Sequence, residues 1–188
     1  MKFNVILADP PWLYNARNNS KTKFGSGMHI YSGMTTDEIC NLPVSDVADT
    51  NCALFLWVTY PRLKDGLKVI ESWGFEYKTC AFTWVKTNKN NDKPFFGIGY
   101  YTKSNAELCL LGIKGKMKPI SNSVSQIIIS PREEHSKKPD ISRDRIVQLF
   151  GNVNKLELFA RQETPNWKSL GNGIDGTDIR DSLKALNT

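Results

Sequence analysis

The sequence is poor in the residues that build metal centres and disulfide frameworks. Its 188 residues include 2 His and 4 Cys, and Cys40, Cys52, Cys80 and Cys109 form no Cys-x-x-Cys pair. Structural zinc sites need about four Cys or His ligands at short spacings, so no metal site is expected. Each cysteine lies in or beside an apolar run, which favours reduced thiols of a cytoplasmic protein.

Long apolar stretches, repeats and low-complexity blocks are also absent. No window reaches the roughly 18 apolar residues of a membrane span, and the polar N-terminus meets Asp9 too soon for a signal peptide, so no membrane partner is expected. Hydrophobic residues make up 40% and charged residues 23% of the chain, which is ordinary globular usage. A chain of this length can bury its own core, so we expect a single domain over residues 1–188.

Apolar runs and helical spacings alternate along the chain. Strands are predicted at 4–8, 52–58, 76–85, 107–113 and 156–160, with a short one at 126–129. Helices are predicted at 35–42, 63–73, 141–150 and 178–186, with a capping box at Thr35–Glu38, an N-cap at Asp140 and stops at Gly74 and Gly151. This alternation is typical of an α/β fold whose central sheet is mostly parallel and flanked by helices.

Three polar segments, 9–34, 86–104 and 114–138, are longer than ordinary connections. Such loops either carry function or contain elements that were not recognised, and function is favoured here. The net charge of +6 is compatible with a polyanionic partner. Lysines and aromatic rings in these loops have the composition of a rim that binds phosphates and stacks bases, although lysine is also ordinary in solvated loops. The residues concerned are Lys21, Lys23, Lys86, Lys89, Lys93, Lys103, Lys114, Lys116, Lys118, Phe95, Phe96, Tyr100 and Tyr101.

The sharpest chemical signal is Asp9-Pro10-Pro11-Trp12, directly after the first predicted strand. Ligands of open α/β sheets bind outside the carboxyl ends of the strands. Two prolines cannot continue a central strand, and they leave carbonyl groups free as acceptors on a stiff support. A carboxylate, rigid carbonyls and an exposed aromatic ring suit a planar group that donates hydrogen bonds, such as the exocyclic amine of a base. A rigid turn with a packed tryptophan is the alternative.

Further motifs accompany this corner in a definite order. They are Ala8-Asp-Pro-Pro-Trp12, Tyr31-Ser-Gly-Met-Thr35, Leu54-Phe-Leu-Trp-Val-Thr59, Trp84-Val-Lys86, Glu107-Leu-Cys-Leu-Leu-Gly112, Glu134-His-Ser-Lys-Lys-Pro-Asp140, Lys155-Leu-Glu-Leu-Phe-Ala-Arg161 and Pro165-Asn-Trp167 through Gly171-Asn172. From Val5 to about Gly176 the chain resembles the adenine amino methyltransferases that carry an Asp-Pro-Pro-Trp motif. That family includes the catalytic subunit of the eukaryotic messenger-RNA adenosine methyltransferase and many bacterial and phage proteins.

The resemblance implies a Rossmann-like methyltransferase fold that uses S-adenosylmethionine, with the catalytic motif before the main cofactor strand. The lack of a Gly-rich turn after the first strand agrees with that permuted order. The implied reaction places a methyl group on the adenine amino group and forms N(6)-methyladenine. DNA is favoured over RNA because the compact chain looks like the bacterial and phage members, and the implied setting is the cytoplasm of a bacterial or phage-infected cell. A homodimer is left open.

The resemblance also implies roles for single residues. Asp9 and the Pro10 carbonyl would accept the two N–H bonds of the amine, with Pro11 and Trp12 completing the catalytic corner and Trp12 stacking on the base. The substrate side would comprise Trp12, Tyr31 and Glu107. The cofactor side would comprise Asp9, Lys138 toward the carboxylate, Arg161 and Asn172 near the ribose, Gln162, and Gly173 in a Gly171–Gly173 turn that holds the adenine. The eukaryotic enzyme has His-Asn where Gln162-Glu163-Thr164 stands here.

Three other readings of the same residues stay open. The reaction could act on RNA, or the chain could be a catalytically inactive subunit that only binds nucleic acid. Related methyltransferases with an acidic-Pro-Pro-aromatic motif methylate the cytosine amino group instead. Identification of the product nucleoside separates these readings.

Overall fold

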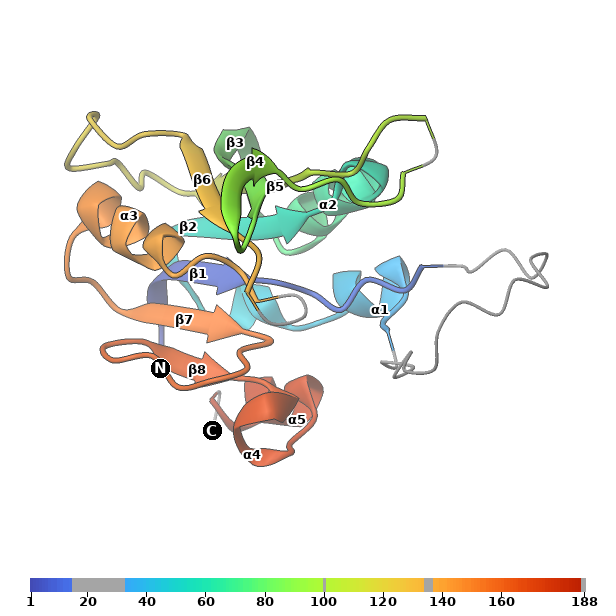
Figure 1. Ribbon diagram of the computed structural model, residues 1–188. Helices are drawn as coiled ribbons and strands as arrows, with labels where there is room; N and C mark the ends of the chain where they lie inside the picture. The colour runs from blue at the N-terminus through green and yellow to red at the C-terminus, as the bar shows by residue number, and fades with distance from the viewer. Residues whose placement is uncertain (15–32, 100, 134–136, 187–188) are drawn as a thin grey trace.

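The computed structural model describes residues 1–14, 33–99, 101–133 and 137–186 (Figure 1). Its centre is an eight-stranded sheet in the order β4-β3-β5-β2-β1-β7-β8, with β6 paired to β3. The strands are β1 (Phe3–Ala8), β2 (Ala48–Val58), β3 (Glu76–Asn88), β4 (Asn91–Pro94), β5 (Ala106–Lys114), β6 (Ile127–Pro131), β7 (Lys155–Leu158) and β8 (Lys168–Leu170). The helices are α1 (Thr36–Cys40), α2 (Leu63–Ser72), α3 (Ile141–Phe150), α4 (Asn172–Asp175) and α5 (Ile179–Ala185), and short 3-10 turns lie at Val44–Asp46 and Tyr60–Arg62.

Most strands of this sheet run in one direction. β1 is parallel to β2 and β7, β7 is parallel to β8, and β3 is parallel to β6. β5 is antiparallel to both β2 and β3, and β4 is antiparallel to β3, so β4 and β5 alone oppose the others. The predicted α/β fold with a mostly parallel, helix-flanked sheet is therefore confirmed.

Local signals in the sequence account for several helix ends. At the start of α1 the Thr35 hydroxyl accepts from the Glu38 backbone N–H and the Glu38 carboxylate accepts from the Thr35 N–H, which completes the predicted capping box. α2 and α3 end before Gly74 and Gly151, whose φ angles of +80° and +76° favour glycine.

Asp140 occupies the predicted N-cap position of α3 but does not cap the helix with its side chain. Asp140 has helical backbone angles and its side chain makes no capping hydrogen bond. Its carboxylate instead pairs with Arg143 at 2.6 Å and with Lys137 at 3.0 Å. Two basic neighbours outcompete the backbone N–H groups for the same oxygens.

The long polar segments contain more regular structure than their composition indicates. Residues 86–104 include the end of β3 and the hairpin strand β4, and residues 114–138 include β6 where a short strand is predicted. The short elements β8 and α4 were not predicted. Much of the segment 9–34 lies outside the described residues.

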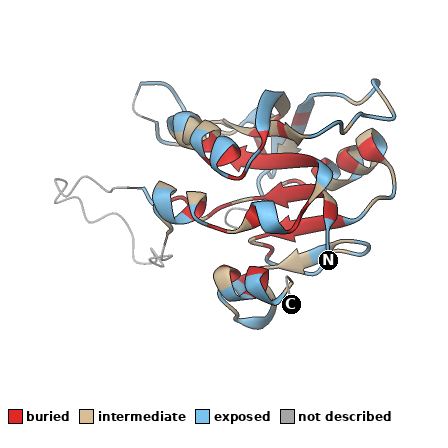
Figure 2. Ribbon diagram, turned by 180° about the vertical axis from the view of Figure 1, so that it is seen from behind, coloured by how far each residue is buried: buried red, intermediate tan, exposed pale blue. Residues whose placement is uncertain are grey.

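Alternation along the central strands fills one core on each face of the sheet. Ile6 of β1 and Leu54 of β2 pack toward α1, α2 and α5, whereas Val5, Leu7 and Phe55 pack toward α3. Figure 2 shows the central strands buried along their length and the outer sides of the helices exposed. No helix in the described part of the chain is long and apolar enough to cross a membrane.

Sheet topology decides which residues meet. The carboxyl ends of β1, β2, β7 and β8 lie at one edge of the sheet, toward which their arrows point in Figure 1. Because β5 is antiparallel, its amino end with Glu107 reaches the same edge, and its carboxyl end with Lys114 reaches the opposite one.

Candidate active site

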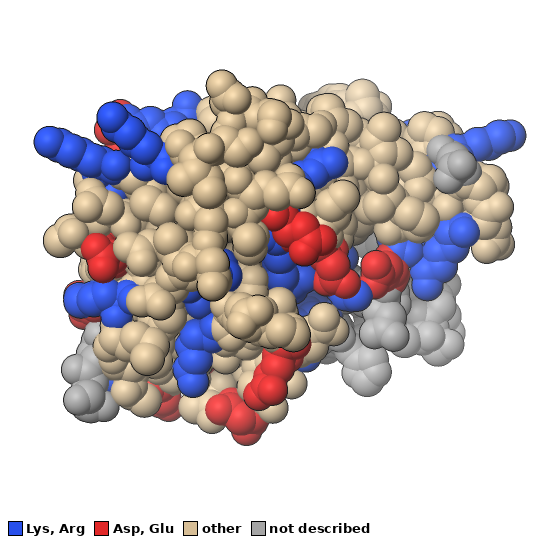
Figure 3. All heavy atoms as spheres, turned by 90° about the vertical axis from the view of Figure 1, so that its left-hand side faces the viewer, with Lys and Arg blue, Asp and Glu red and all other residues tan. Residues whose placement is uncertain are grey.

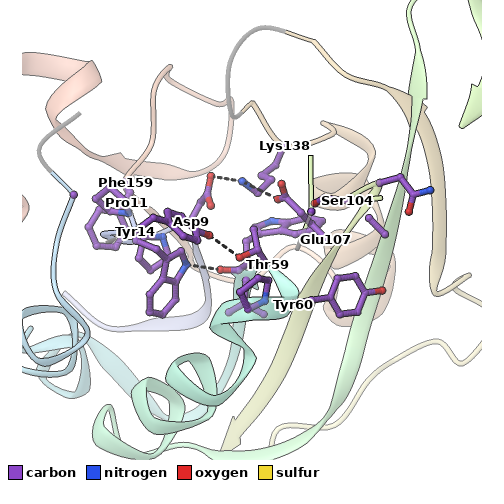
Figure 4. A pocket seen from close by; sticks show the side chains of 18 of the residues that line it. Asp9, Pro11, Tyr14, Thr59, Tyr60, Ser104, Glu107, Lys138 and Phe159 are labelled. Atoms are coloured by element: carbon purple, nitrogen blue, oxygen red, sulfur yellow. Dashed lines mark hydrogen bonds and ion pairs between the residues drawn. The ribbon is translucent and has the colours of Figure 1, made fainter. Parts of the chain in front are cut away.

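A large cleft opens at the edge of the sheet where these strand ends meet (Figure 4). Residues that follow β1, β2, β6, β7 and β8 or precede β5 line it, and the segment between β4 and β5 contributes to the lining. The lining includes Asp9, Pro10, Pro11, Trp12, Trp57, Thr59, Ile98, Tyr101, Lys103, Glu107, Lys138, Phe159, Arg161, Asn172 and Gly173. The cleft therefore joins the Asp-Pro-Pro-Trp corner to the residues around Arg161.

Acidic and basic side chains form a chain of ion pairs at this cleft. Lys138 Nζ lies 2.8 Å from Asp9 Oδ2 and 3.3 Å from Glu107 Oε2, and Lys86 pairs with the other oxygen of Glu107. Figure 4 shows Asp9 and Glu107 on either side of Lys138. No described residue donates a hydrogen bond to Asp9 Oδ1. One oxygen of Asp9 is thus held by Lys138, while the other is available to a ligand.

Burial and charge oppose each other in this network. Burial raises the pKa of Asp9, and the positive charge of Lys138 offsets only part of that rise. Burial acts to lower the pKa of Lys138, but the carboxylates of Asp9 and Glu107 outweigh it and raise that pKa. Burial likewise acts against ionisation of Glu107, yet Lys138 and Lys86 together lower its pKa. Lys138 and Glu107 are therefore charged at neutral pH, and Asp9 is the group whose ionisation is weakest.

The prolines make the corner stiff but do not leave its carbonyl groups free. The Pro10 carbonyl accepts from the Trp12 N–H at 2.9 Å, and the Pro11 carbonyl accepts from the Met34 N–H at 2.7 Å. A carbonyl oxygen has two lone pairs, so each retains one for a ligand. The prediction that both carbonyl groups are free is therefore wrong, because each already accepts one hydrogen bond.

Trp12 is not the exposed ring that the sequence suggested. Only 9% of it is accessible, it belongs to the hydrophobic core, and its indole N–H donates to the Trp57 carbonyl at 3.2 Å. The exposed rings at the cleft include those of Tyr14, Tyr60 and Tyr101. The Tyr14 hydroxyl lies 2.6 Å from Thr59 Oγ1, and the Arg62 guanidinium lies 5.0 Å from the Tyr14 ring centre.

Most of the other predicted site residues lie in this cleft, and among the described ones only Gln162 does not. Arg161, Asn172 and Gly173 line the same cleft as Asp9. Gln162 lines a smaller adjoining cavity instead, which shares Asp9, Trp57, Lys138, Phe159 and Arg161 with the main cleft. Tyr31 lies outside the described residues.

Glycine is required where β8 passes the end of β7. A Cβ atom on Gly171 would lie 2.3 Å from the Ala160 carbonyl oxygen, and one on Gly173 would lie 3.0 Å from Arg161 Cα. These close approaches bring the backbone of Gly171–Gly173 against Arg161 and shape one end of the cleft.

Sequence reasoning missed several residues of the cleft, and two of them have unusual features. Phe159 adopts a left-handed backbone with φ of +62°, which is strained for a residue with a side chain and is typical of functional sites. The Trp57 indole N–H is buried and, among the described residues, has no hydrogen-bond partner. No sequence pattern predicts the backbone strain of Phe159 or the unpartnered N–H of Trp57, since both depend on how strands distant in sequence pack together.

The arrangement suits a ligand that has charges of both signs and hydroxyl groups. Asp9 offers a carboxylate for an ammonium group, Lys138 offers an ammonium for a carboxylate, and Asn172 and Arg161 offer polar groups for hydroxyls. The unpartnered Trp57 N–H adds a donor at the wall that both cavities share. Among the described residues no cluster of three His, Cys, Asp or Glu side chains could hold a metal ion.

Comparison with known proteins agrees with the family resemblance. Residues 3–173 match the model of the MT-A70 family. The chain is 34% identical to the type II methyltransferase M.MunI of Mycoplasma sp, over 95% of this chain and 80% of that protein. It is 32% identical to an N(6)-adenosine-methyltransferase MT-A70-like protein of Arabidopsis thaliana and to the human N(6)-adenosine-methyltransferase catalytic subunit METTL3. These two matches include 97% and 96% of this chain, but only 25% of the Arabidopsis protein and 30% of the human protein.

Proposed function

The chain belongs to the MT-A70 family of adenine N6-methyltransferases, and on that premise we propose that it transfers a methyl group from S-adenosylmethionine to the exocyclic amino group of adenine in DNA. The observation that carries the proposal is the single cleft that contains both the Asp9 corner and the Arg161–Gly173 end. A transferase of this kind needs the acceptor amine and the methyl donor in one enclosure.

The donor set of the cleft fits S-adenosylmethionine, which MT-A70 methyltransferases generally use. When bound, this group supplies a methyl carbon activated by a positively charged sulfur. We propose that Lys138 and the Trp57 N–H hold its carboxylate, that Asp9 contacts its ammonium group, and that Arg161 and Asn172 contact its ribose. Gly171–Gly173, packed against Arg161, would border its adenine, and Gln162 would border the adjoining cavity.

The chain itself must make the adenine amine a better nucleophile. The nitrogen lone pair of that amine is delocalised into the ring, so it reacts poorly unless its N–H groups are held. Asp9 Oδ1 and the remaining lone pair of the Pro10 carbonyl would accept those two N–H groups, since Lys138 holds the other Asp9 oxygen and the Trp12 N–H takes one lone pair of Pro10. As positive charge grows on the nitrogen, the Asp9 carboxylate stabilises it.

Tyr14 is better placed than Trp12 to stack on the target base. Tyr14 is half exposed at the cleft, whereas Trp12 is buried with its N–H bonded. Stacking of a base on an aromatic ring contributes about 1–3 kcal/mol. Trp12 would then hold the Asp9–Trp12 segment against the hydrophobic core. Glu107 would act on the substrate side, where it pairs with Lys138.

DNA is the nucleic acid we propose. The chain aligns with most of the length of the type II methyltransferase M.MunI but with less than a third of the N(6)-adenosine-methyltransferases. We further propose that residues 1–188 act as one domain, because the Met1 amino group donates to the Leu186 carbonyl at 3.0 Å and ties the two ends of the chain together.

The test is incubation with isotope-labelled S-adenosylmethionine and either DNA or RNA, followed by digestion to nucleosides and mass spectrometry. We expect labelled N(6)-methyldeoxyadenosine from DNA. Label in N(6)-methyladenosine from RNA alone would reverse the choice of nucleic acid, and label in cytosine would contradict the choice of base.

Asp9→Asn should reduce turnover by about 10²–10³-fold, the usual loss of one preorganised contact to the transition state. Donor binding without methyl transfer by the wild-type chain would favour the inactive subunit.

A further inference from the structure

The segment between β4 and β5 forms a narrow arm beside the cleft, here named the rim hairpin and comprising the described residues 97–99 and 101–104 (Figure 1). Gly97 and Ser104 exchange backbone hydrogen bonds of 3.1 and 3.2 Å. A Cβ on Gly97 would lie 2.5 Å from the Ser104 carbonyl oxygen, and one on Gly99 would lie 2.0 Å from the Thr102 carbonyl oxygen. The two sides of the hairpin therefore approach so closely that glycine is needed at both positions.

Two large apolar side chains project from this hairpin without any cover. Ile98 and Tyr101 are 100% and 101% exposed, and both line the cleft that contains Asp9. Single exposed apolar residues are common on protein surfaces, but two fully exposed ones at the tip of an arm over a cleft are typical of a contact site. A polar or charged tip would serve equally well if the hairpin only bordered the cleft.

Charge and anchoring indicate the kind of partner. Lys103, on the returning side of the hairpin, lines the cleft and is exposed to solvent. At the base of the arm the Arg132 guanidinium lies 3.7 Å from the ring centre of Phe95, which ties the arm to the end of β6. An anchored apolar tip beside a cation fits a partner that has an anionic surface and an apolar interior. A nucleic-acid duplex has both, with phosphates outside and stacked bases inside.

We propose that the rim hairpin is a wedge, in which Ile98 and Tyr101 occupy the space that the target adenine leaves when it turns out of a duplex into the cleft. This inference rests on the proposed function. An adenine inside a duplex cannot reach Asp9 while it is stacked and paired, and enzymes that act on bases turn the base out. Apolar side chains inserted between base steps are a known way to hold the opened duplex. A single strand has no such gap to fill.

The wedge predicts that its loss affects only paired substrates. The substrates are a DNA oligonucleotide that the wild-type chain methylates, presented as a matched duplex, as a duplex with an abasic site opposite the target adenine, and as a single strand. We expect Ile98→Ser/Tyr101→Ser to lower the methylation rate at least 10-fold on the matched duplex. On the abasic duplex and the single strand we expect a change of less than about 3-fold, because opening is already easy there.

Matched controls separate the wedge from a loss of structure. Ile127→Ser/Ile129→Ser removes two exposed isoleucines from β6 and should leave the ratio among the three substrates unchanged. Unchanged thermal unfolding and S-adenosylmethionine binding of the hairpin variant confirm that it is folded. Equal losses on all three substrates, no loss on the matched duplex, or wild-type activity on single strands alone would overturn the wedge. If the wild-type chain methylated no DNA oligonucleotide in any of the three forms, the proposed function would be overturned, and the wedge with it.

Discussion

Lys138 lies between two carboxylates, and its charge limits how far burial raises the pKa of Asp9. Burial raises the pKa of Asp9 and Lys138 opposes that rise. The proposed role of Asp9 requires the carboxylate form, and the fraction of that form falls as the pH drops through the pKa. A raised pKa therefore places the loss of activity at a higher pH than for an ordinary aspartate.

We expect turnover at saturating donor and substrate to decline on the acid side with an apparent pKa above the usual range of aspartate. Lys138→Met removes the charge that opposes the rise, so the acid limb should move to still higher pH. Lys137→Met is the matched control, because Lys137 pairs with Glu133 and Asp140 instead. Rate measurements across pH, with the folded fraction checked at each point, provide the test. An acid limb that stays in place in Lys138→Met would contradict the assignment.

Short motifs allowed several of these residues to be predicted from the sequence. Asp9, Lys138, Arg161 and Asn172 each belong to a motif of the resembling family, and they meet in one cleft. The sequence left open whether Trp12 is exposed or packed, since its N–H acceptor on Trp57 lies 45 positions away in the sequence. The unpartnered N–H of Trp57 depends on packing between strands and leaves no trace in the local sequence.

At the scale of elements, the reversal of β5 contributes most to the site. An apolar run such as residues 107–113 predicts a strand but not its direction. Only pairing with β2 and β3 shows that Glu107 reaches the same edge as Asp9. β4, β8 and α4 contain 4, 3 and 4 residues, which is too short for a periodic pattern to indicate them.

The passage of β8 over the end of β7 leads to a second prediction. In Gly171→Ala the new methyl group would collide with the backbone of Ala160. We expect about 1–3 kcal/mol of destabilisation, the usual cost of overpacking. For a chain of this length, that lowers the melting temperature by about 2–4 °C for each kcal/mol. Since Asn172 and Gly173 would be displaced, S-adenosylmethionine binding should weaken as well.

Gly176→Ala is the comparison for this prediction. Gly176 has a φ of +79° and nothing within 4 Å of the position of a Cβ, so alanine there causes backbone strain without collision. We expect a loss of stability of about 1 kcal/mol and no change in cofactor binding. Calorimetric unfolding and titration of both variants provide the measurements. Equal cofactor affinity in Gly171→Ala and the wild type would show that this turn does not border the cofactor.

At the scale of the whole molecule, the fold divides the lysines that the sequence grouped together. Lys103 lines the cleft, but Lys114 ends β5 at the opposite edge of the sheet, and Lys116 and Lys118 follow it there. Figure 3, which shows the left-hand side of Figure 1, displays basic side chains separated by acidic and uncharged ones. A single phosphate-binding rim containing all of these lysines is therefore wrong, because strand direction places them on two sides of the molecule.

This division predicts how salt affects nucleic-acid binding. A lysine that neutralises a phosphate releases a counterion, so its removal reduces the slope of log affinity against log salt by about 1. We expect that reduction in Lys103→Ala, since Lys103 stands at the mouth of the cleft beside the rim hairpin. Lys116→Ala removes an equally exposed charge from the opposite edge and should leave the slope unchanged. Fluorescence anisotropy with a labelled duplex at several salt concentrations measures both slopes. If Lys116→Ala changed the slope and Lys103→Ala did not, the duplex would lie on the edge of the sheet opposite Asp9, too far from the cleft for its adenine to be the acceptor.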